Sequence, residues 1–287
     1  MPLCLSEDEI TERASLLPAF PKVVADILAT IDDDNATVSA LIELVESDPV
    51  ITARVLSMAN SAAKSGSWRK GLRDMHVAVS LIGLSRLRQI VVSLSLADFA
   101  RETRVHRGYW DHSVAVGVAA QELARLRTSQ DSSLVSVDYA LVAGLLHDLG
   151  FLWMARFYPL EYQMARQALA QPGQSNLDIE RHYFGVDHCE IGRVLASGWG
   201  LPSSIIEAIA THHQPEHASG RLAAIVHVAE ILAVALGMGM SGHQQFIHLS
   251  EAACIAAGLD WQDDLNPLFG RIEARSRHLG RIFQAMP

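Results

Sequence analysis

Cysteine is scarce in this sequence and follows no pattern. Cys4, Cys189 and Cys254 are odd in number and share no spacing typical of metal ligands, which disfavours a disulfide framework or a cysteine-rich metal module. The start of the sequence carries no recognisable secretory leader. We therefore expect a reducing, cytoplasmic location.

The sequence also lacks a long uninterrupted apolar run and an excess of basic residues. The apolar stretch 225–240 is interrupted by His227, Glu230 and glycines, so we expect no transmembrane helix and no membrane partner. Lys and Arg total 23 against 32 for Asp and Glu, a formal charge of -9. That balance argues against broad binding to nucleic-acid phosphates and leaves only a local basic patch open.

Strand-like alternation and internal repeats are absent as well, whereas apolar residues recur at helical spacing in nearly every segment. Asp48 followed by Pro49 is a strong helix start, because it joins a capping acceptor to a proline at the first helical position. A hydrophobic content of 49% supplies a core for these helices. The sequence therefore predicts an all-α fold.

We expect helices over 37–46, 75–82, 84–100, 109–127, 160–170, 177–183, 189–196, 222–236, 250–257 and 265–283. Polar segments at 61–73, 101–108 and 128–136 separate some of them. A further helix carries His147 and Asp148, and Gly150 marks its end or a kink.

The adjacent pair His147 and Asp148, in the run Ala-Gly-Leu-Leu-His-Asp-Leu-Gly, is the strongest chemical signal in the chain. Further candidate ligands follow an order that a metal cage would need: His112, His188, His212, His213 and Glu230. Imidazole nitrogens and carboxylate oxygens together suit Fe, Mn or Zn, and an aspartate can bridge two ions. The sequence predicts a site for one or two divalent ions.

Small residues favour close packing around this site. Ala140, Ala143 and Gly144 precede His147 at helical spacing, and the helix of His112 is lined by small residues that include Gly117. We infer that these two helices lie close enough together for both to supply ligands.

Each candidate ligand also has a purely structural interpretation. His212 and His213 fit a helix C-terminus, where the dipole favours positive charge, and His112 fits a buried histidine with one hydrogen bond. Cys189 stands beside His188 and could touch a metal, although a small buried thiol is the simpler interpretation. The ordered set as a whole favours metal binding.

Several runs of the sequence carry a family resemblance. They are Leu-Pro-Ala-Phe-Pro at 17–21, the run 48–62, Ala-Val-Ser-Leu-Ile-Gly at 78–83, Phe-Gly-Val-Asp-His at 184–188, Trp-Gly-Leu-Pro at 199–202 and His-His-Gln-Pro at 212–215. On these runs the chain resembles the HDOD proteins, a bacterial signalling family related to the HD metal-dependent phosphohydrolases. The resemblance covers most of the chain, from about Leu17 to Glu230.

The resemblance implies an HDOD domain over 13–213, with an N-terminal helical lobe at 1–105 packed on an HD-like lobe with terminal helices at 106–287. His112, His147, Asp148 and Glu230 fall where HD proteins hold a first metal. His188, His212 and His213 fall where the HD-GYP phosphodiesterases hold further metals. In an active enzyme Asp148 would be the bridging catalytic ligand, and metal-acidified water would attack a phosphate ester.

Three departures from active relatives weaken the enzyme interpretation. Phe151 stands where many of them have a lysine that neutralises substrate phosphate. The run 214–216 replaces Gly-Tyr-Pro, and Glu230 replaces the usual aspartate. We therefore expect a non-catalytic signal-transduction module. The alternative is a metal-dependent phosphohydrolase acting on a nucleotide or cyclic dinucleotide.

The regulatory interpretation implies other signalling proteins as partners and a phosphorylated small molecule as a candidate ligand. No receiver or other sensor domain fits in the length, so we expect the signal to come from another chain or from a ligand on the second lobe. A nucleic-acid-binding regulator ranks lowest, because Arg86 and Arg88 fit a solvated helix face better. The sequence does not determine the oligomeric state.

Overall fold

The computed structural model describes residues 3–18, 20–31, 37–63, 74–103, 107–126, 135–169, 175–238 and 249–284. Every regular element in these ranges is a helix, which confirms the predicted all-α class. The predicted polar segments 61–73 and 128–136 lie mostly outside the described residues. The third, 101–108, is largely occupied by the end of one helix and the start of the next.

The chain divides into two compact units. Unit 1 comprises Met1–Pro18 and Thr103–Arg281, and unit 2 comprises Ala19–Glu102 with the C-terminal residues from Ile282. The change of unit near Thr103 falls close to the expected lobe boundary at 105. The first eighteen residues, which we assigned to the N-terminal lobe, belong instead to unit 1.

Unit 2 is built from consecutive helices: α2 (Lys22–Ala29), α3 (Val38–Glu46), α4 (Pro49–Ala63), α5 (Met75–Ile82) and α6 (Leu84–Thr103). The predicted start of α4 is confirmed, because the backbone N–H of Ile51 donates to Asp48 Oδ1 at 3.1 Å. Between α5 and α6, Gly83 adopts a φ of 83°, a conformation that favours glycine.

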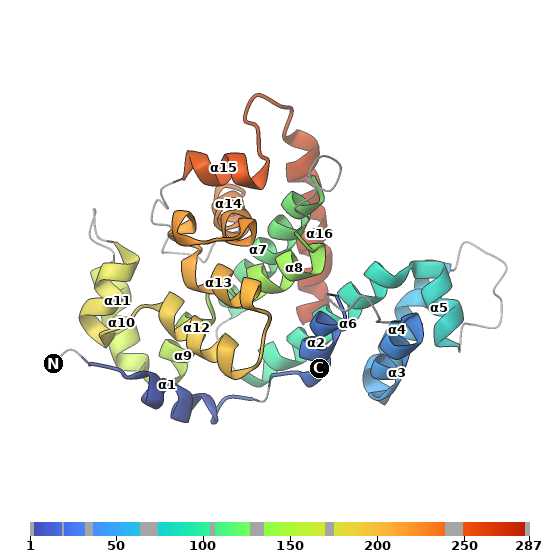
Figure 1. Cartoon of the computed structure of the whole chain (residues 1–287), viewed down its shortest axis with the longest axis horizontal. Coiled ribbons are helices and arrows are strands. Elements are labelled where there is room, and N and C mark those ends of the chain that lie inside the picture. Colours follow the sequence, from blue (N-terminus) through green and yellow to red (C-terminus); the bar gives the residue numbers. More distant parts are fainter. Residues whose placement is uncertain are drawn as a thin grey trace. The chain divides into compact units, whose positions relative to one another are not determined.

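Unit 1 holds the remaining elements. They are α1 (Glu7–Ala14), α7 (Arg107–Leu126), α8 (Val137–Leu146), α9 (Leu149–Phe157), α10 (Pro159–Ala168), α11 (Asn176–Phe184), α12 (His188–Gly198), α13 (Ser203–Thr211), the 3-10 turn η1 (Pro215–His217), α14 (Arg221–Ala235), α15 (Glu251–Ala257) and α16 (Asn266–Gln284). The helices α7, α8 and α14 pack against one another in the middle of the unit (Figure 1).

Two facing glycines bring α7 and α8 together. A Cβ added to Gly144 would lie 2.7 Å from the Cα of Gly117, and one added to Gly117 would lie 3.0 Å from the carbonyl oxygen of Leu141. No side chain fits at such separations, so these positions require glycine. The predicted close packing of the two helices is confirmed.

The N-terminal segment belongs to unit 1 because it is attached there by backbone and side-chain contacts. Leu3 N–H donates to the Tyr183 carbonyl at 2.8 Å, and Leu5 N–H donates to the Phe184 carbonyl at 2.9 Å. The helix α1, which the sequence analysis did not predict, then packs on α12 through the buried Ile10 (Figure 1).

One stretch of the described chain is long and apolar enough to cross a membrane. It spans Val137–Phe157, and 83% of its most apolar window is buried inside the fold. The pair α5 and α6 passes the same test only when joined, and it bends by 108° at the break. Core packing therefore accounts for the apolar composition of α8 and α9.

Candidate metal centre

The seven predicted ligands all lie in unit 1, and the helices bring them together. They are His112 on α7, His147 and Asp148 between α8 and α9, His188 at the start of α12, His212 and His213 after α13, and Glu230 on α14. One ligand atom from each residue lies within 4.8 Å of the others in three overlapping groups. The groups are His112, His147 and Asp148; His147, His212 and Glu230; and His188, Cys189, His212 and His213.

Four imidazoles surround the carboxylate of Asp148. His147 Nε2 lies 3.2 Å and His112 Nε2 3.9 Å from Oδ2. On the other side, His188 Nε2 lies 3.6 Å and His212 Nε2 3.8 Å from Oδ1. Atoms that bind one ion at about 2.0–2.2 Å lie roughly 3.0–3.6 Å apart, so these separations are close to those of a shared coordination shell.

Hydrogen bonds fix which nitrogen of each ring faces the centre. His147 Nδ1–H donates to the Gly144 carbonyl and His212 Nδ1–H to the Ile209 carbonyl, both at 2.8 Å. His112 Nδ1 lies 3.3 Å from the Met238 carbonyl. Because Nδ1 carries the proton in each of these contacts, the neutral form of each ring has its lone pair on Nε2, the nitrogen that lies toward Asp148. Metal-binding histidines use the same arrangement.

The break between α8 and α9 corrects the predicted continuous helix through His147 and Asp148. His147 is the last residue associated with α8, and Asp148 precedes α9 with φ −95° and ψ 18°. Gly150 does not end a helix but lies inside α9, where an added Cβ would be 2.0 Å from the His188 carbonyl oxygen. Gly150 therefore lets α9 approach the first turn of α12, which carries His188.

Burial keeps three of the histidines neutral. It lowers the pKa of His112 to about 4, and the neighbouring His147 acts in the same direction. Burial also lowers the pKa values of His212 and His213 well below the usual value. Neutral imidazole is the form that binds a metal, so these rings need lose no proton to do so.

The two buried carboxyl groups of the centre, Asp148 and Glu230, favour a nearby positive charge. Burial opposes the charge of Asp148, but the positive charge of His147 and, after it, of His188 outweighs burial and holds the pKa of Asp148 well below its usual range. Burial raises the pKa of Glu230 to about 7. A buried anion needs a nearby cation, and a bound metal ion would meet this need for both groups.

Buried polar atoms without a hydrogen-bond partner indicate whether the candidate ligands fit a metal ion. Among the described side chains, Asp148 Oδ1 and Glu230 Oε2 are buried and have no hydrogen-bond partner, and His147 Nε2 has only the ion-pair contact with Asp148 Oδ2 at 3.2 Å. Each such atom costs roughly 1–3 kcal/mol if nothing else satisfies it. All three belong to ligand types that Fe, Mn and Zn accept. The donor set therefore fits a divalent cation.

The centre is almost sealed from solvent. His147, His188 and His212 are 0% exposed and Asp148 is 2% exposed, whereas the His213 side chain retains 12%. Phe151 contributes to this closure, because its ring stacks on that of His188 with centroids 4.1 Å apart and planes 14° apart. His213 is therefore the predicted ligand with the most contact with solvent.

One more residue, Glu180, supports the centre, and it was not among the predicted ligands. Glu180 Oε2 accepts hydrogen bonds from His188 Nδ1 at 2.7 Å and from the His188 backbone N–H at 2.8 Å. Glu180 is 2% exposed and lies on α11, eight residues before its partner. No motif marked it, because its role depends on how α11 folds back onto the start of α12.

We expect Glu180→Gln to weaken metal binding without preventing folding. The amide keeps the shape of the side chain but no longer offers a charged acceptor to orient His188, and loss of such a partner costs about 10- to 100-fold in affinity. Titration of the metal-free protein with Zn²⁺ measures the change. Glu190→Gln on α12 is the control, because Glu190 binds Arg193 rather than a histidine. Equal affinities for both variants would contradict the assigned role.

Comparisons with known proteins identify the family. The model of the HDOD domain matches residues 17–215, so this chain belongs to the HDOD domain family. A solved HDOD domain protein of unknown function from Geobacter sulfurreducens has a TM-score of 0.74 at 24% identity, over 96% of this chain and 99% of that one. At this identity the likeness shows the fold alone, and that fold is the one expected from the motifs.

Curated relatives are longer than this chain. An uncharacterised protein of Treponema pallidum is 27% identical over 210 residues, which are 73% of this chain and 40% of that protein. Ribonuclease Y of Thermus thermophilus is 25% identical over 186 residues, which are 56% of this chain and 32% of that protein. The chain thus spans less than half the length of these relatives.

Proposed function

We propose that this chain is a non-catalytic HDOD regulatory module in which a buried divalent cation holds the HD-like unit in one arrangement. The closure of the centre is the observation that carries this proposal. Its ligands come from five places along the chain and are nearly inaccessible to solvent. Structural metal sites are closed in this way, whereas catalytic sites keep one position open to water and substrate.

Phe151 supports the same proposal. A phosphate ester needs cationic groups beside the metal to balance its charge, and active relatives often place a lysine at this position. Here an aromatic ring, 5% exposed, packs on the face of His188. An apolar side chain offers no charge to a phosphate and occupies space beside a ligand.

The cation would connect helices that are distant in sequence. His112, His147, Asp148 and Glu230 would hold one ion, and His188, His212 and His213 would provide the remaining donors. When bound, a cation in such a site acts as a Lewis acid that acidifies water and neutralises anionic oxygen. In a closed site its main effect is to stabilise the folded state, because it binds the folded chain and not the unfolded one.

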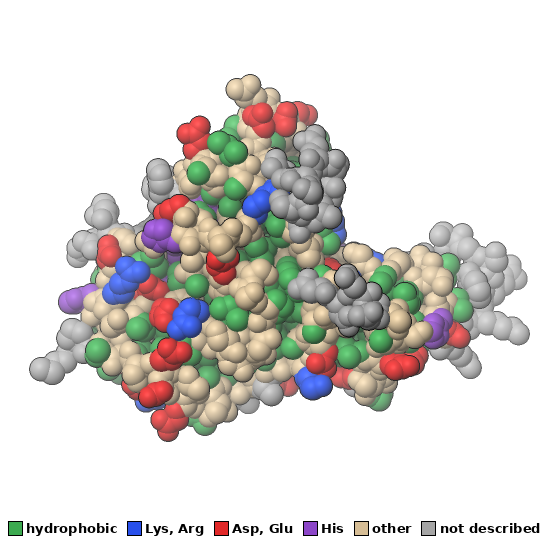
Figure 2. Space-filling model, viewed as in Figure 1, with side chains coloured by type: hydrophobic (Ala, Val, Ile, Leu, Met, Phe, Trp, Pro, Cys, Tyr) green, Lys and Arg blue, Asp and Glu red, His purple; other side chains and the backbone are tan. Residues whose placement is uncertain are grey.

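The partners we propose are other signalling proteins of a bacterial cytoplasm, which would contact the helical surface, with a phosphorylated small molecule as a candidate ligand. Nucleic acid is the least favoured partner. Figure 2 shows basic side chains scattered singly among acidic ones over the described residues of the face it presents. Nucleic-acid surfaces instead gather basic residues into a patch or stripe.

The enzyme is the second candidate, and one observation favours it. Asp148 lies within 3.2–3.9 Å of four imidazoles, which is how a carboxylate would lie between two ions. The substrate class would be a phosphodiester, such as a cyclic dinucleotide. The likeness to ribonuclease Y adds RNA to the substrates worth testing.

Hydrolysis assays separate the two candidates. We expect the full chain, loaded in turn with Mn²⁺, Fe²⁺ or Zn²⁺, to cleave none of a panel of nucleotides, cyclic di-GMP and RNA, because Asp148 and the rings around it are almost inaccessible to solvent. The same protein should melt at a higher temperature with the cation than after chelation. Turnover that disappears in Asp148→Ala, with helical content unchanged, would overturn the regulatory proposal and establish the enzyme.

A further inference from the structure

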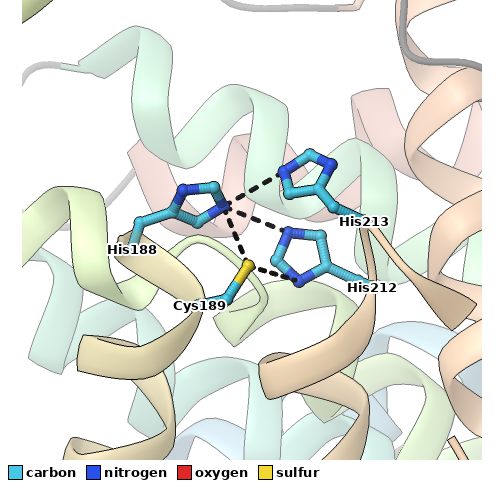
Figure 3. Close-up of side chains that lie close together, drawn as sticks. All are labelled: His188, Cys189, His212 and His213. Carbon is cyan, nitrogen blue, oxygen red and sulfur yellow. Dashed lines mark hydrogen bonds between the residues drawn. The ribbon is translucent and has the colours of Figure 1, made fainter. Parts of the chain in front are cut away.

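We propose that Cys189 is a metal ligand and that its thiolate, with His188, His212 and His213, forms a second cation site of three nitrogens and one sulfur. This inference rests on the proposed metal binding and goes beyond it by assigning a ligand and a cation class. Figure 3 shows the four side chains pointing toward one another from the start of α12 and the end of α13.

The distances match the edges of a tetrahedral zinc site. With bonds of about 2.0–2.1 Å to nitrogen and about 2.3 Å to sulfur, neighbouring nitrogens should be roughly 3.3 Å apart and sulfur roughly 3.6 Å from nitrogen. His188 Nε2 lies 3.3 Å from His212 Nε2 and 3.1 Å from His213 Nε2. Cys189 Sγ lies 3.5 Å from His188 Nε2. These pairs thus have the spacing of ligands around one ion.

Hydrogen bonds orient two of the imidazoles for this site as well. Glu180 accepts the proton of His188 Nδ1, and the Ile209 carbonyl accepts that of His212 Nδ1. The Nε2 lone pair of His188 is therefore available 3.5 Å from Sγ, and the Nε2 lone pair of His212 faces His188, whereas the His212 nitrogen that lies 3.9 Å from Sγ is Nδ1. Without a cation, three imidazole nitrogens and a thiol, all of them able to accept, meet in the protein interior.

The sulfur side of the centre also has a path to the surface. A cavity of about 330 Å³ is lined by Cys189 and His213 together with residues of α11 and α12 that include Arg181 and Glu190. Cys189 itself is only 5% exposed, so it borders this cavity from below the surface. The site at Cys189 therefore differs from the sealed surroundings of Asp148 in its access.

Sulfur decides which cations the site prefers. When the ion binds, the Cys189 S–H bond breaks, its proton passes to solvent and the sulfur lone pair forms the bond to the cation. Thiolate with imidazole favours Zn²⁺ and Co²⁺, whereas Mn²⁺ prefers oxygen ligands. We thus expect the site to select Zn²⁺ or Co²⁺ over Mn²⁺.

Cobalt substitution of the full chain tests the assignment. We expect metal-free protein titrated with Co²⁺ to develop a thiolate-to-cobalt charge-transfer absorption in the near ultraviolet, and Zn²⁺ to remove it by competition. Cys189→Ser should lose this absorption, whereas Cys254→Ser should keep it, because Cys254 is a buried cysteine on α15 outside the cluster. The serine variant should also lose about tenfold or more of its preference for Zn²⁺ over Mn²⁺.

The outcomes distinguish this proposal from the proposed function. If wild-type protein binds Co²⁺ with visible d–d bands and no charge-transfer absorption, or if the absorption survives in Cys189→Ser, the sulfur ligand is excluded while metal binding stands. If no Co²⁺ or Zn²⁺ binds at all, the metal part of the proposed function fails as well.

Melting temperatures of both serine variants show whether each is folded. If Cys189→Ser does not fold, alkylation of Cys189 decides, because bound Zn²⁺ should protect the wild-type thiol and an unprotected thiol overturns the proposal.

Discussion

We expect Asp148→Asn to abolish binding of a divalent cation and to leave the helices folded. Asp148 is the carboxylate around which His112, His147, His188 and His212 converge, so the substitution affects every ligand group. An amide retains the size but lacks the negative charge that offsets the cation. We expect an affinity loss larger than the roughly 10- to 100-fold that follows the loss of an outer-shell partner.

Metal content and thermal stability report this effect together. At a free cation concentration 100 times the dissociation constant, the wild-type protein gains about 2.7 kcal/mol of folding free energy, and the variant should gain almost nothing. Asp138→Asn is the matched control, because Asp138 is also buried on α8 but lies at the far end of the helix from His147. Stoichiometric metal in purified Asp148→Asn would contradict the assigned centre.

Gly150→Ala should be the most disruptive of the glycine substitutions. The added Cβ would lie 2.0 Å from the carbonyl oxygen of His188 and 2.6 Å from its carbonyl carbon, and backbone atoms cannot turn aside as a side chain can. Helix α9 must then move away from α12, at a cost of about 1–3 kcal/mol or more. Because His188 moves with α12, metal affinity should fall with stability.

Gly270→Ala should have the opposite effect on stability. Gly270 lies inside α16, and an added Cβ meets nothing within 4 Å. Alanine there should stabilise the fold by up to about 1 kcal/mol, because it favours the helix without a clash. Chemical denaturation of both variants measures the contrast. Equal stabilities would show that the approach of α9 to α12 does not constrain residue 150.

The sequence predicted helix bounds well where residues within or next to the helix determine them. The helix start at Asp48–Pro49 and the bounds Met75–Ile82 needed only a capping residue, a proline and apolar spacing, and the structure has both as predicted. The break between His147 and Asp148 was not predicted. Apolar periodicity continues through both helices, and the end or kink predicted at Gly150 falls two residues after the turn at Asp148.

The residues of the candidate metal centre also divide into those that the sequence predicted and those that only the structure revealed. The seven predicted ligands could be picked out because residue type and order limit which side chains can serve an ion, and the packing of α7, α8, α12, α13 and α14 brings them together. Glu180 was missed, and Cys189 was interpreted as a simple buried thiol. The contact of Glu180 with His188 at 2.7 Å and the proposed ligand role of Cys189, which lies 3.5 Å from His188, depend on distances that no spacing along the chain reveals.

The sequence by itself determined the all-α class and the chemical kinds of ligand, because helical periodicity and side-chain donors are properties of short segments. Only the tertiary structure decided that the first eighteen residues belong to unit 1, that the centre is closed and that Phe151 covers His188. Closure depends on how helices distant in sequence pack against one another. That packing, rather than the presence of the ligands, supports a regulatory module over a hydrolase.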